Sequence, residues 1–195
     1  NEQSKRQFSG SILQLGRQTF YFSEQEFSQW AEKMNTELAE SDEKHPKDQI
    51  ISDILFFKLL GFDEVFSADY SNYESPDFIF DLNNPVPEEY HDRFDVIYDG
   101  GTMEHCFNTF QVLKNIHLML KEGGRVIHSS PSNNHVDHGF YMFSPTLFAD
   151  YYNANSWTVR TLNIFKYTRG HIHEPWYIYE YTPGCLEFYA FGGFN

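Results

Sequence analysis

Short apolar segments alternate with helix-like segments along this chain, and three of the apolar segments end in an acidic residue. They comprise residues 64–69, 77–81 and 93–99, and each has the length and the apolar content of a buried strand. A chain that alternates strands with helices folds into right-handed βαβ units. We therefore expect an α/β fold with a mostly parallel sheet flanked by helices.

The rest of the chain supplies four further strand-like segments and four predicted helices. The strands are expected over residues 11–16, 125–128, 157–164 and 187–191, and the helices over residues 23–33, 48–60, 108–120 and 144–153. Ser23 and Ser144 are typical N-terminal caps, and Gly61 stands where a C-terminal cap belongs. Together the segments predict seven strands.

The chain of 195 residues is acidic, with 28 Asp and Glu against 14 Lys and Arg and a formal net charge of −14. Such a charge repels a phosphate backbone, so we expect no nucleic-acid partner and no membrane partner. A hydrophobic share of 41%, with 20 Phe, 13 Tyr and 3 Trp, supplies material for a packed core and argues against a disordered acidic chain.

Two cysteines, Cys106 and Cys185, are too few for a disulfide framework, and no apolar run approaches the ~20 residues that span a bilayer. Residues 1–10 do not resemble a signal peptide. We therefore expect a cytoplasmic protein. No internal repeat or Gly/Ser-rich linker interrupts the sequence, which predicts a single domain over residues 1–195.

In an open parallel sheet, ligands bind over the carboxyl ends of the strands, near the point where the strand order reverses. The expected strands put Gly16, Asp69, Asp81 and Asp99 along that edge. An acid after the second strand can accept two hydrogen bonds from a ribose diol, and an acid beside the third can meet an adenine amino group. Each acid can instead cap its own loop.

Two longer segments resemble the middle of the class I S-adenosylmethionine-dependent methyltransferases. Residues 94–105 read FDVIYDGGTMEH, and residues 113–127 read LKNIHLMLKEGGRVI, with the Leu-Lys-x-Gly-Gly signature that precedes the fifth strand in that family. Four further stretches resemble a branch often encoded with surface-polysaccharide genes: Asp69 and residues 81–83, 138–141 and 143–145. The resemblance covers residue 11 to about residue 164.

The resemblance implies a Rossmann-like fold of seven strands, with helices on both faces and the last strand antiparallel. It also implies methyl transfer from S-adenosylmethionine to an oxygen or nitrogen of a small acceptor, with a saccharide or its precursor as the acceptor to test first. The site residues that it implies are Asp69 for the ribose, Asp81 and Leu82 for the adenine, Gly16, Arg17 and Gln18 for the methionine end, Asp99 and Gly100 for the floor, and His105 or His138 as the base.

The sequence departs from the family where the first strand ends. The family has a Gly-x-Gly-x-Gly turn there, whereas residues 15–19 read LGRQT and keep a single glycine, Gly16. The side chains after it narrow the approach of a ligand to the backbone. Arg17 can pair with the carboxylate of the cofactor or form a surface ion pair. A protein that kept the fold as a binding scaffold and lost catalysis is therefore the second hypothesis.

A third hypothesis is a metal-dependent enzyme built on four loop histidines. His135 and His138, with His171, His173 and Glu174, supply enough ligands if their loops converge. They complete no recognised zinc signature, and the alternative is a pair of polar loops at the edge of the sheet, so we assign no metal ligand.

An aromatic segment, residues 175–181, lies between the last two expected strands. Its rings suit three roles: a wall against the acceptor, a surface for protein contact, or ordinary core. The sequence does not choose among the three.

Overall fold

The computed structural model describes residues 7–20, 24–34, 52–166 and 176–182. The chain divides into two compact units. The first contains residues 1–131 and 135–141, and the second contains residues 132–134 and 142–195. The expectation of a single domain stays a prediction.

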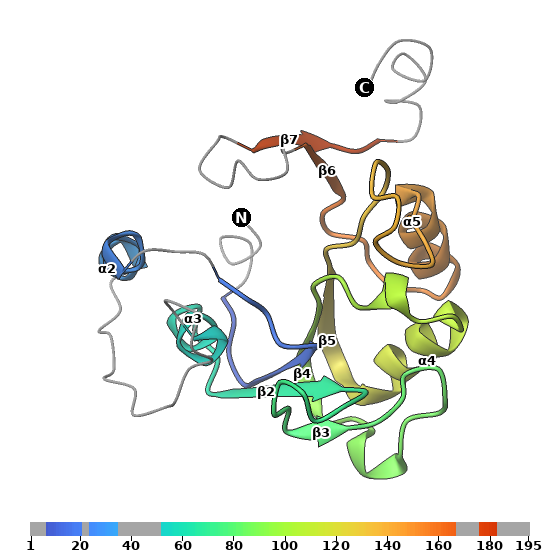
Figure 1. Ribbon diagram of the computed structural model, residues 1–195, viewed down its shortest axis with the longest axis horizontal. Coiled ribbons are helices and arrows are strands. Elements are labelled where there is room, and N and C mark those ends of the chain that lie inside the picture. Colours follow the sequence, from blue (N-terminus) through green and yellow to red (C-terminus); the bar gives the residue numbers. More distant parts are fainter. Residues whose placement is uncertain (1–6, 21–23, 35–51, 167–175, 183–195) are drawn as a thin grey trace. The chain divides into compact units, whose positions relative to one another are not determined.

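Five strands of the described residues form the sheet of the first unit, and every neighbouring pair runs parallel (Figure 1). The strands are β1 (Ser11–Leu15), β2 (Glu64–Asp69), β3 (Phe78–Ile79), β4 (Phe94–Asp99) and β5 (Leu120–His128). Their order across the sheet is β3-β2-β1-β4-β5, so the order reverses between β1 and β4. The predicted parallel α/β sheet is confirmed.

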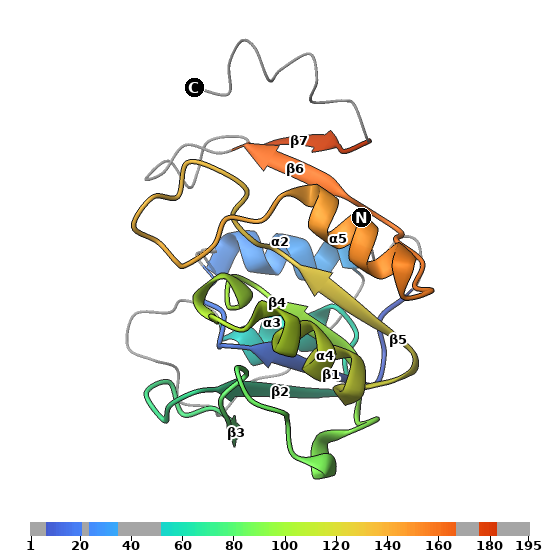
Figure 2. The same ribbon diagram turned by 90° about the vertical axis from the view of Figure 1, so that its right-hand side faces the viewer.

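Helices cover both faces of this sheet. Ile12 in β1 packs with Phe57 of α3 (Asp53–Leu59) in one hydrophobic cluster. Successive side chains of a strand point to opposite faces, so Leu13 points away from α3. Figures 1 and 2 show α4 (Thr109–Met119) on the side of the sheet opposite to α3. All of β1 is buried, as expected for a central strand with both faces covered.

Two helices, α2 and α3, pack against each other in the first unit. Helix α2 (Glu24–Met34) packs through Phe27 against Leu59 of α3, and its predicted cap, Ser23, lies outside the described residues. Helix α3 begins at Asp53, because the Ser52 hydroxyl accepts a hydrogen bond from an amide in the first turn and caps the helix there. Residues 48–51 of the predicted helix lie outside the described residues.

Helix α3 ends at the predicted glycine. Gly61 has a φ of +106°, and its N–H donates to the Lys58 carbonyl at 2.9 Å. A Cβ on Gly61 would lie 2.8 Å from the Phe8 carbonyl oxygen, so this position needs both the left-handed backbone and the absence of a side chain.

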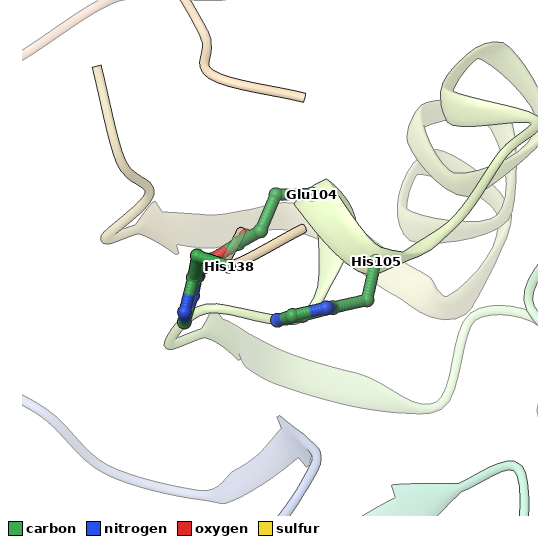
Figure 3. Close-up of side chains that lie close together, drawn as sticks. All are labelled: Glu104, His105 and His138. Carbon is green, nitrogen blue, oxygen red and sulfur yellow. Dashed lines mark ion pairs between the residues drawn. The ribbon is translucent and has the colours of Figure 1, made fainter. Parts of the chain in front are cut away.

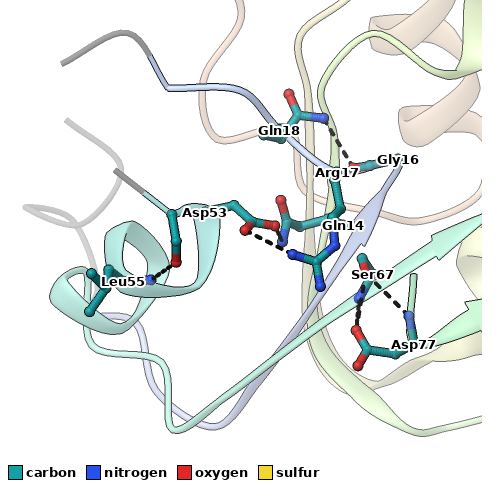
Figure 4. Close-up of polar contacts among 9 residues, drawn as sticks. Gln14, Gly16, Arg17, Gln18, Asp53, Leu55, Ser67 and Asp77 are labelled. Carbon is teal, nitrogen blue, oxygen red and sulfur yellow. Dashed lines mark hydrogen bonds and ion pairs between the residues drawn. The ribbon is translucent and has the colours of Figure 1, made fainter. Parts of the chain in front are cut away.

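Strand β3 is shorter than predicted because the acids at both its ends are engaged elsewhere. The Asp77 carboxylate accepts hydrogen bonds from the Ser67 N–H at 2.8 Å and the Ser67 hydroxyl at 3.0 Å (Figure 4). Asp81 starts a turn, in which the N–H of Asn84 donates to the Asp81 carbonyl. The strand predicted over residues 77–81 is therefore reduced to two residues.

Strand β5 begins at Leu120, directly after α4, rather than at residue 125. Its pairing with β4 shifts register between Phe94 and Val96, where the extra residues of β5 bulge outward. Gly123 in this bulge has a φ of +73°, and a Cβ on Gly124 would lie 2.8 Å from a neighbouring carbonyl oxygen. The Gly-Gly pair thus serves a bulge rather than a loop.

The second unit contains α5 (Pro145–Ala154) and the strands β6 (Asn163–Lys166) and β7 (Tyr177–Glu180). Helix α5 starts as predicted, with Ser144 as its cap and proline in its first turn. The strands β6 and β7 pair antiparallel in a sheet of their own, in which Phe165 stacks on Trp176 with 5.3 Å between ring centroids.

The prediction of one seven-stranded sheet is wrong for the described residues, which form a five-stranded sheet and a separate two-stranded one. The strand predicted over residues 157–164 exists only from Asn163 onward. Residues 177–180 of the aromatic segment are a strand that sequence analysis did not predict. The strand predicted over residues 187–191 lies outside the described residues.

Asn115 of α4 fixes the loop that follows β3. Its side chain is fully buried, accepts a hydrogen bond from the Val86 N–H at 3.0 Å, and donates to the carbonyls of Leu82 at 3.1 Å and Asn84 at 2.8 Å. One amide therefore satisfies three backbone groups of the loop.

We predict that Asn115→Ala lowers the free energy of unfolding by about 3 kcal/mol, because it leaves buried loop groups without partners. Urea unfolding measures the change. Asn153→Ala, at an exposed position of α5, is the matched control and should change stability by less than about 0.5 kcal/mol. A loss in Asn115→Ala no larger than in the control would contradict this assignment.

Asp95 of β4 gives the fold a dependence on pH. Its carboxylate accepts hydrogen bonds from the Ser11 N–H at 2.8 Å and the Ser11 hydroxyl at 3.0 Å, and it pairs with Lys121 at 2.7 Å. Partial burial opposes the charge, but the hydrogen bonds from Lys121 and Ser11 outweigh it and lower the pKa below its ordinary value of 3.8.

A lowered pKa means that ionised Asp95 stabilises the folded state above pH ~4, and that this stabilisation is lost as the pH falls through the folded pKa. We predict that Asp95→Asn costs about 1 kcal/mol at pH 7, since the group is partly exposed, and that the cost disappears toward pH 2. Unfolding free energies across this pH range test it, with exposed Asp150→Asn as control. A cost that is constant with pH would contradict the ionic role.

Candidate functional site

The candidate site lies at the carboxyl edge of the sheet, where Asp99 ends β4. Asp99 is fully buried between Leu15 of β1 and His128 of β5 in the strand register. One carboxylate oxygen accepts hydrogen bonds from the N–H groups of Thr102 at 3.0 Å and Met103 at 3.1 Å, and the other lies 2.7 Å from His128 Nδ1. Asp99 thus holds the turn after β4 in place, and its role in the floor of a cofactor site stays a prediction.

Gly16, at the end of β1, adopts a conformation that favours glycine. Its φ is +73°, and its N–H donates to the Ala68 carbonyl at 2.8 Å. The Thr102 hydroxyl donates to the Leu15 carbonyl and lies 3.0 Å from the place of a Cβ on Gly16. Close packing against the β4 turn therefore adds to the backbone's preference for glycine.

Gln18 covers the point at which the strand order reverses. Its side-chain amide donates to the Gly16 carbonyl at 3.2 Å (Figure 4), and its oxygen lies 2.3 Å from the place that a Cβ on Gly100 would take. A side chain at position 100 would therefore collide with Gln18, and glycine avoids that collision. The structure brings these three predicted site residues together and fills part of the expected approach with Gln18.

Arg17 pairs with Asp53 at the start of α3. Its guanidinium lies 3.2 Å from one Asp53 oxygen, and the Gln14 amide donates to the other at 2.8 Å (Figure 4). The side chains of Arg17 and Asp53 are 20% and 3% exposed, so the pair is more buried than a surface ion pair. The sequence left open whether Arg17 pairs with the carboxylate of a cofactor or forms a surface ion pair. In the structure, Arg17 pairs with a carboxylate of the protein, that of Asp53.

The carboxyl end of β2 is acidic. Asp69 accepts a hydrogen bond from the Ser71 N–H at 3.1 Å. Burial raises the pKa of nearby Glu74, the charge of Asp69 raises it further, and Arg17 opposes the shift. Asp69, Glu74 and Arg17 therefore influence one another, and the predicted ribose residue lies beside a second acid that sequence analysis did not select.

Asp81 caps its own loop. One oxygen accepts hydrogen bonds from the backbone and side-chain N–H groups of Asn83 at 2.9 and 2.8 Å, and the other accepts from the Asn84 side chain at 3.0 Å. The next residue, Leu82, is buried. In the structure, Asp81 thus forms the loop cap that the sequence allowed as an alternative. A contact of Asp81 or Leu82 with adenine stays a prediction.

The two candidate bases, His105 and His138, lie together with Glu104 (Figure 3). The centroids of the two imidazole rings are 4.8 Å apart, and His138 Nε2 lies 3.4 Å from a Glu104 carboxylate oxygen. Glu104 is 1% exposed, whereas both histidines are exposed. A buried acid thus supports imidazoles that solvent can reach.

The backbone fixes this arrangement from both sides. Glu104 and His105 belong to the 3₁₀ turn Met103–His105, whose first N–H donates to the Asp99 carboxylate. The N–H of Phe140 donates to the Glu104 carbonyl at 2.8 Å. A Cβ on Gly139 would lie 2.9 Å from that carbonyl oxygen, so only glycine allows the segment to approach so closely.

Burial alters the electrostatics of this cluster. Burial raises the pKa of Glu104, with a further contribution from the charge of Asp99, whereas the backbone N–H of Glu104 and the hydrogen bond with His138 oppose the rise. Burial lowers the pKa of His105, and the neighbouring His138 lowers it further. A lowered pKa keeps His105 neutral near pH 7, which is the form that accepts a proton.

His135 also joins this loop cluster. Its ring packs edge-on against His138 with 5.2 Å between centroids. The other members of the predicted four-histidine site, His171, His173 and Glu174, lie outside the described residues. The sequence signal for the observed cluster is the Glu-His pair at residues 104–105, of which only His105 was selected as a candidate site residue.

Exposed aromatic side chains lie next to the cluster. Phe107 and Phe140 are 74% and 66% exposed, and their rings meet edge-on with 6.0 Å between centroids. The Tyr141 hydroxyl donates to the Phe107 carbonyl at 2.9 Å. Such rings suit stacking against a sugar or a planar acceptor.

Comparison of the chain with protein-family models, with curated proteins and with solved structures finds no match. Among the helices of the described residues, none has the length and apolar character needed to cross a membrane.

Cys106 lies just after the turn that carries Glu104 and His105. Burial raises its pKa to about 11, with further contributions from the charges of Asp99, Asp81 and Glu104. We predict that at pH 8 a thiol reagent modifies Cys106 at no more than about one hundredth of the rate for an unfolded chain, because only the thiolate reacts. The Cys185→Ser variant isolates this thiol, and urea supplies the unfolded reference. Equal rates with and without urea would contradict the assignment.

Proposed function

We propose that this protein is a methyltransferase that moves a methyl group from S-adenosylmethionine to an oxygen or nitrogen of a small acceptor in the cytoplasm. The observation that carries the proposal is that the candidate site residues lie along one edge of a parallel sheet with the strand order β3-β2-β1-β4-β5. Asp69 ends β2 on one side of the strand-order reversal, and the turn after β4 carries His105 on the other. A Rossmann-like fold binds nucleotide-containing ligands at this place.

The residues at the edge fit such a ligand in part. Asp69 offers a carboxylate to a ribose diol. The positive φ of Gly16 turns the chain at the end of β1, so the backbone there lies at the edge where the ligand would bind. Gln18 must turn away from Gly100 to admit the methionine end, and the Arg17 guanidinium must serve a ligand carboxylate while it pairs with Asp53. Both side chains are long enough for such shared roles.

The histidines supply the base. S-adenosylmethionine provides an activated methyl on a sulfonium, so the protein must align an acceptor and remove its proton. His105 or His138 accepts that proton, and Glu104 orients His138 through the 3.4 Å contact. Phe107 and Phe140 offer their faces to the acceptor, and we propose a saccharide or its precursor as the first class to test.

Calorimetric titration with S-adenosylmethionine and S-adenosylhomocysteine tests the proposal. We expect both to bind, and a concentration ~100 times the dissociation constant to stabilise the fold by about 2.7 kcal/mol. Asp69→Ala should weaken binding at least tenfold, about 1.4 kcal/mol, through loss of the ribose contact. The control Asp150→Ala, at an exposed position of α5, should bind as the wild type does. Absence of binding at millimolar ligand would refute the proposal.

A second candidate function is that of a binding scaffold without catalysis. The observation that favours it is the contact of Gln18 with Gly100. The Gln18 side chain occupies part of the space at the point where the strand order reverses. The Gln18→Ala variant distinguishes the two functions. If Gln18 contacts the methionine end, the variant binds S-adenosylhomocysteine more weakly; if Gln18 blocks the site of a scaffold, the variant gains binding that the wild type lacks.

A further inference from the structure

We propose that Glu104, His105 and His138 form a binding site for one divalent transition-metal ion, with Zn²⁺ as the best-suited ion. Each residue offers one ligand atom, and the three atoms lie within 4.8 Å of one another (Figure 3). The proposal concerns an ion rather than a methyl donor, so it does not rest on the function proposed above.

The set of donor atoms determines the class of ion. Two imidazole nitrogens with one carboxylate oxygen suit Zn²⁺ and its neighbours, whereas sites for Mg²⁺ or Ca²⁺ consist mainly of oxygens. Three protein ligands leave at least one coordination position open for water or a substrate atom. The exposure of His105 and His138 gives solvent access to that position.

The burial of Glu104 is an independent observation that points to a cation. Its side chain is 1% exposed, and its Oε2 atom is buried without a hydrogen-bond partner. A buried carboxylate oxygen without a partner is costly, and most such atoms in proteins are satisfied. An ion between the carboxylate and the two imidazoles satisfies this oxygen directly or through a bound water.

The spacing is close to that of a coordination sphere. Bonds of about 2.1 Å in a tetrahedral site place neighbouring ligand atoms about 3.4 Å apart. The distance from His138 Nε2 to Glu104 Oε1 is 3.4 Å. Contraction of a 4.8 Å separation to this spacing requires one atom to move by about 1.4 Å, which rotation of an exposed imidazole provides.

The backbone around the three residues is already fixed. Asp99 holds the turn that carries Glu104 and His105, and the N–H of Phe140 ties the segment of His138 to the Glu104 carbonyl. An ion that binds here therefore needs to fix only the rotations of the side chains. A site with a fixed backbone loses little conformational entropy on binding.

The alternative is that Glu104 and His138 form an ion pair that serves the fold alone. Titration of tag-free, chelator-treated protein with Co²⁺ separates the two, because Co²⁺ in a site of low coordination number absorbs visible light. We expect one equivalent to bind, with an absorption band that one equivalent of Zn²⁺ removes. Absence of the band and of heat in a Zn²⁺ titration at millimolar metal would overturn the proposal.

Single variants identify the ligands. Glu104→Gln keeps the shape of the buried side chain. His105→Ala changes only an exposed side chain, so this variant should fold normally. Each should weaken Zn²⁺ binding at least tenfold. His117→Ala, at an exposed position of α4, is the matched control and should bind as the wild type does. Equal loss in the control, or no loss in either variant, would overturn the assignment of ligands.

Discussion

The buried carboxylate of Asp99 is the interaction on which the candidate site depends. It joins the end of β4 to His128 of β5 and to two N–H groups of the turn that carries Glu104 and His105. A buried carboxylate is stable only when it is well supplied with hydrogen bonds, and these three partners meet that need. The same bonds direct the turn toward the segment of His138, so the central sheet and the surface histidines form one connected structure.

The edge that Asp99 organises has two chemically different parts. At the ends of β1 and β2, an acidic group around Asp69 lies near the Arg17–Asp53 pair and suits a polar ligand with hydroxyl groups. At the ends of β4 and β5, imidazoles supported by Glu104 suit proton transfer or metal binding. An ion held by His105 and His138 would make both of these residues ligands rather than bases. The metal state of the protein therefore decides which chemistry this part of the edge can perform.

The sequence predicted the strands of the central sheet well, because β1, β2 and β4 are apolar runs that end in a glycine or an acid. It could not predict that β6 pairs with β7, since a strand pattern does not specify the partner. Nor could it show that Asp81 uses both carboxylate oxygens within its own loop whereas Asp69 accepts a single hydrogen bond from its loop, because both are single acids at the ends of predicted strands. The approach of His138 to Glu104 depends on Gly139, at which a side chain would collide with the turn. Such contacts between distant segments have no periodic signal.

We propose that the carboxyl edge between β2 and β5 binds a nucleotide-containing methyl donor. Amide chemical shifts of ¹⁵N-labelled protein, followed during titration with S-adenosylhomocysteine, test it most directly because they locate the ligand on the chain. We expect shifts concentrated at Gly16, Asp69, Gly100 and the turn that carries His105. Shifts confined to other regions, or an unchanged spectrum at millimolar ligand, would contradict it.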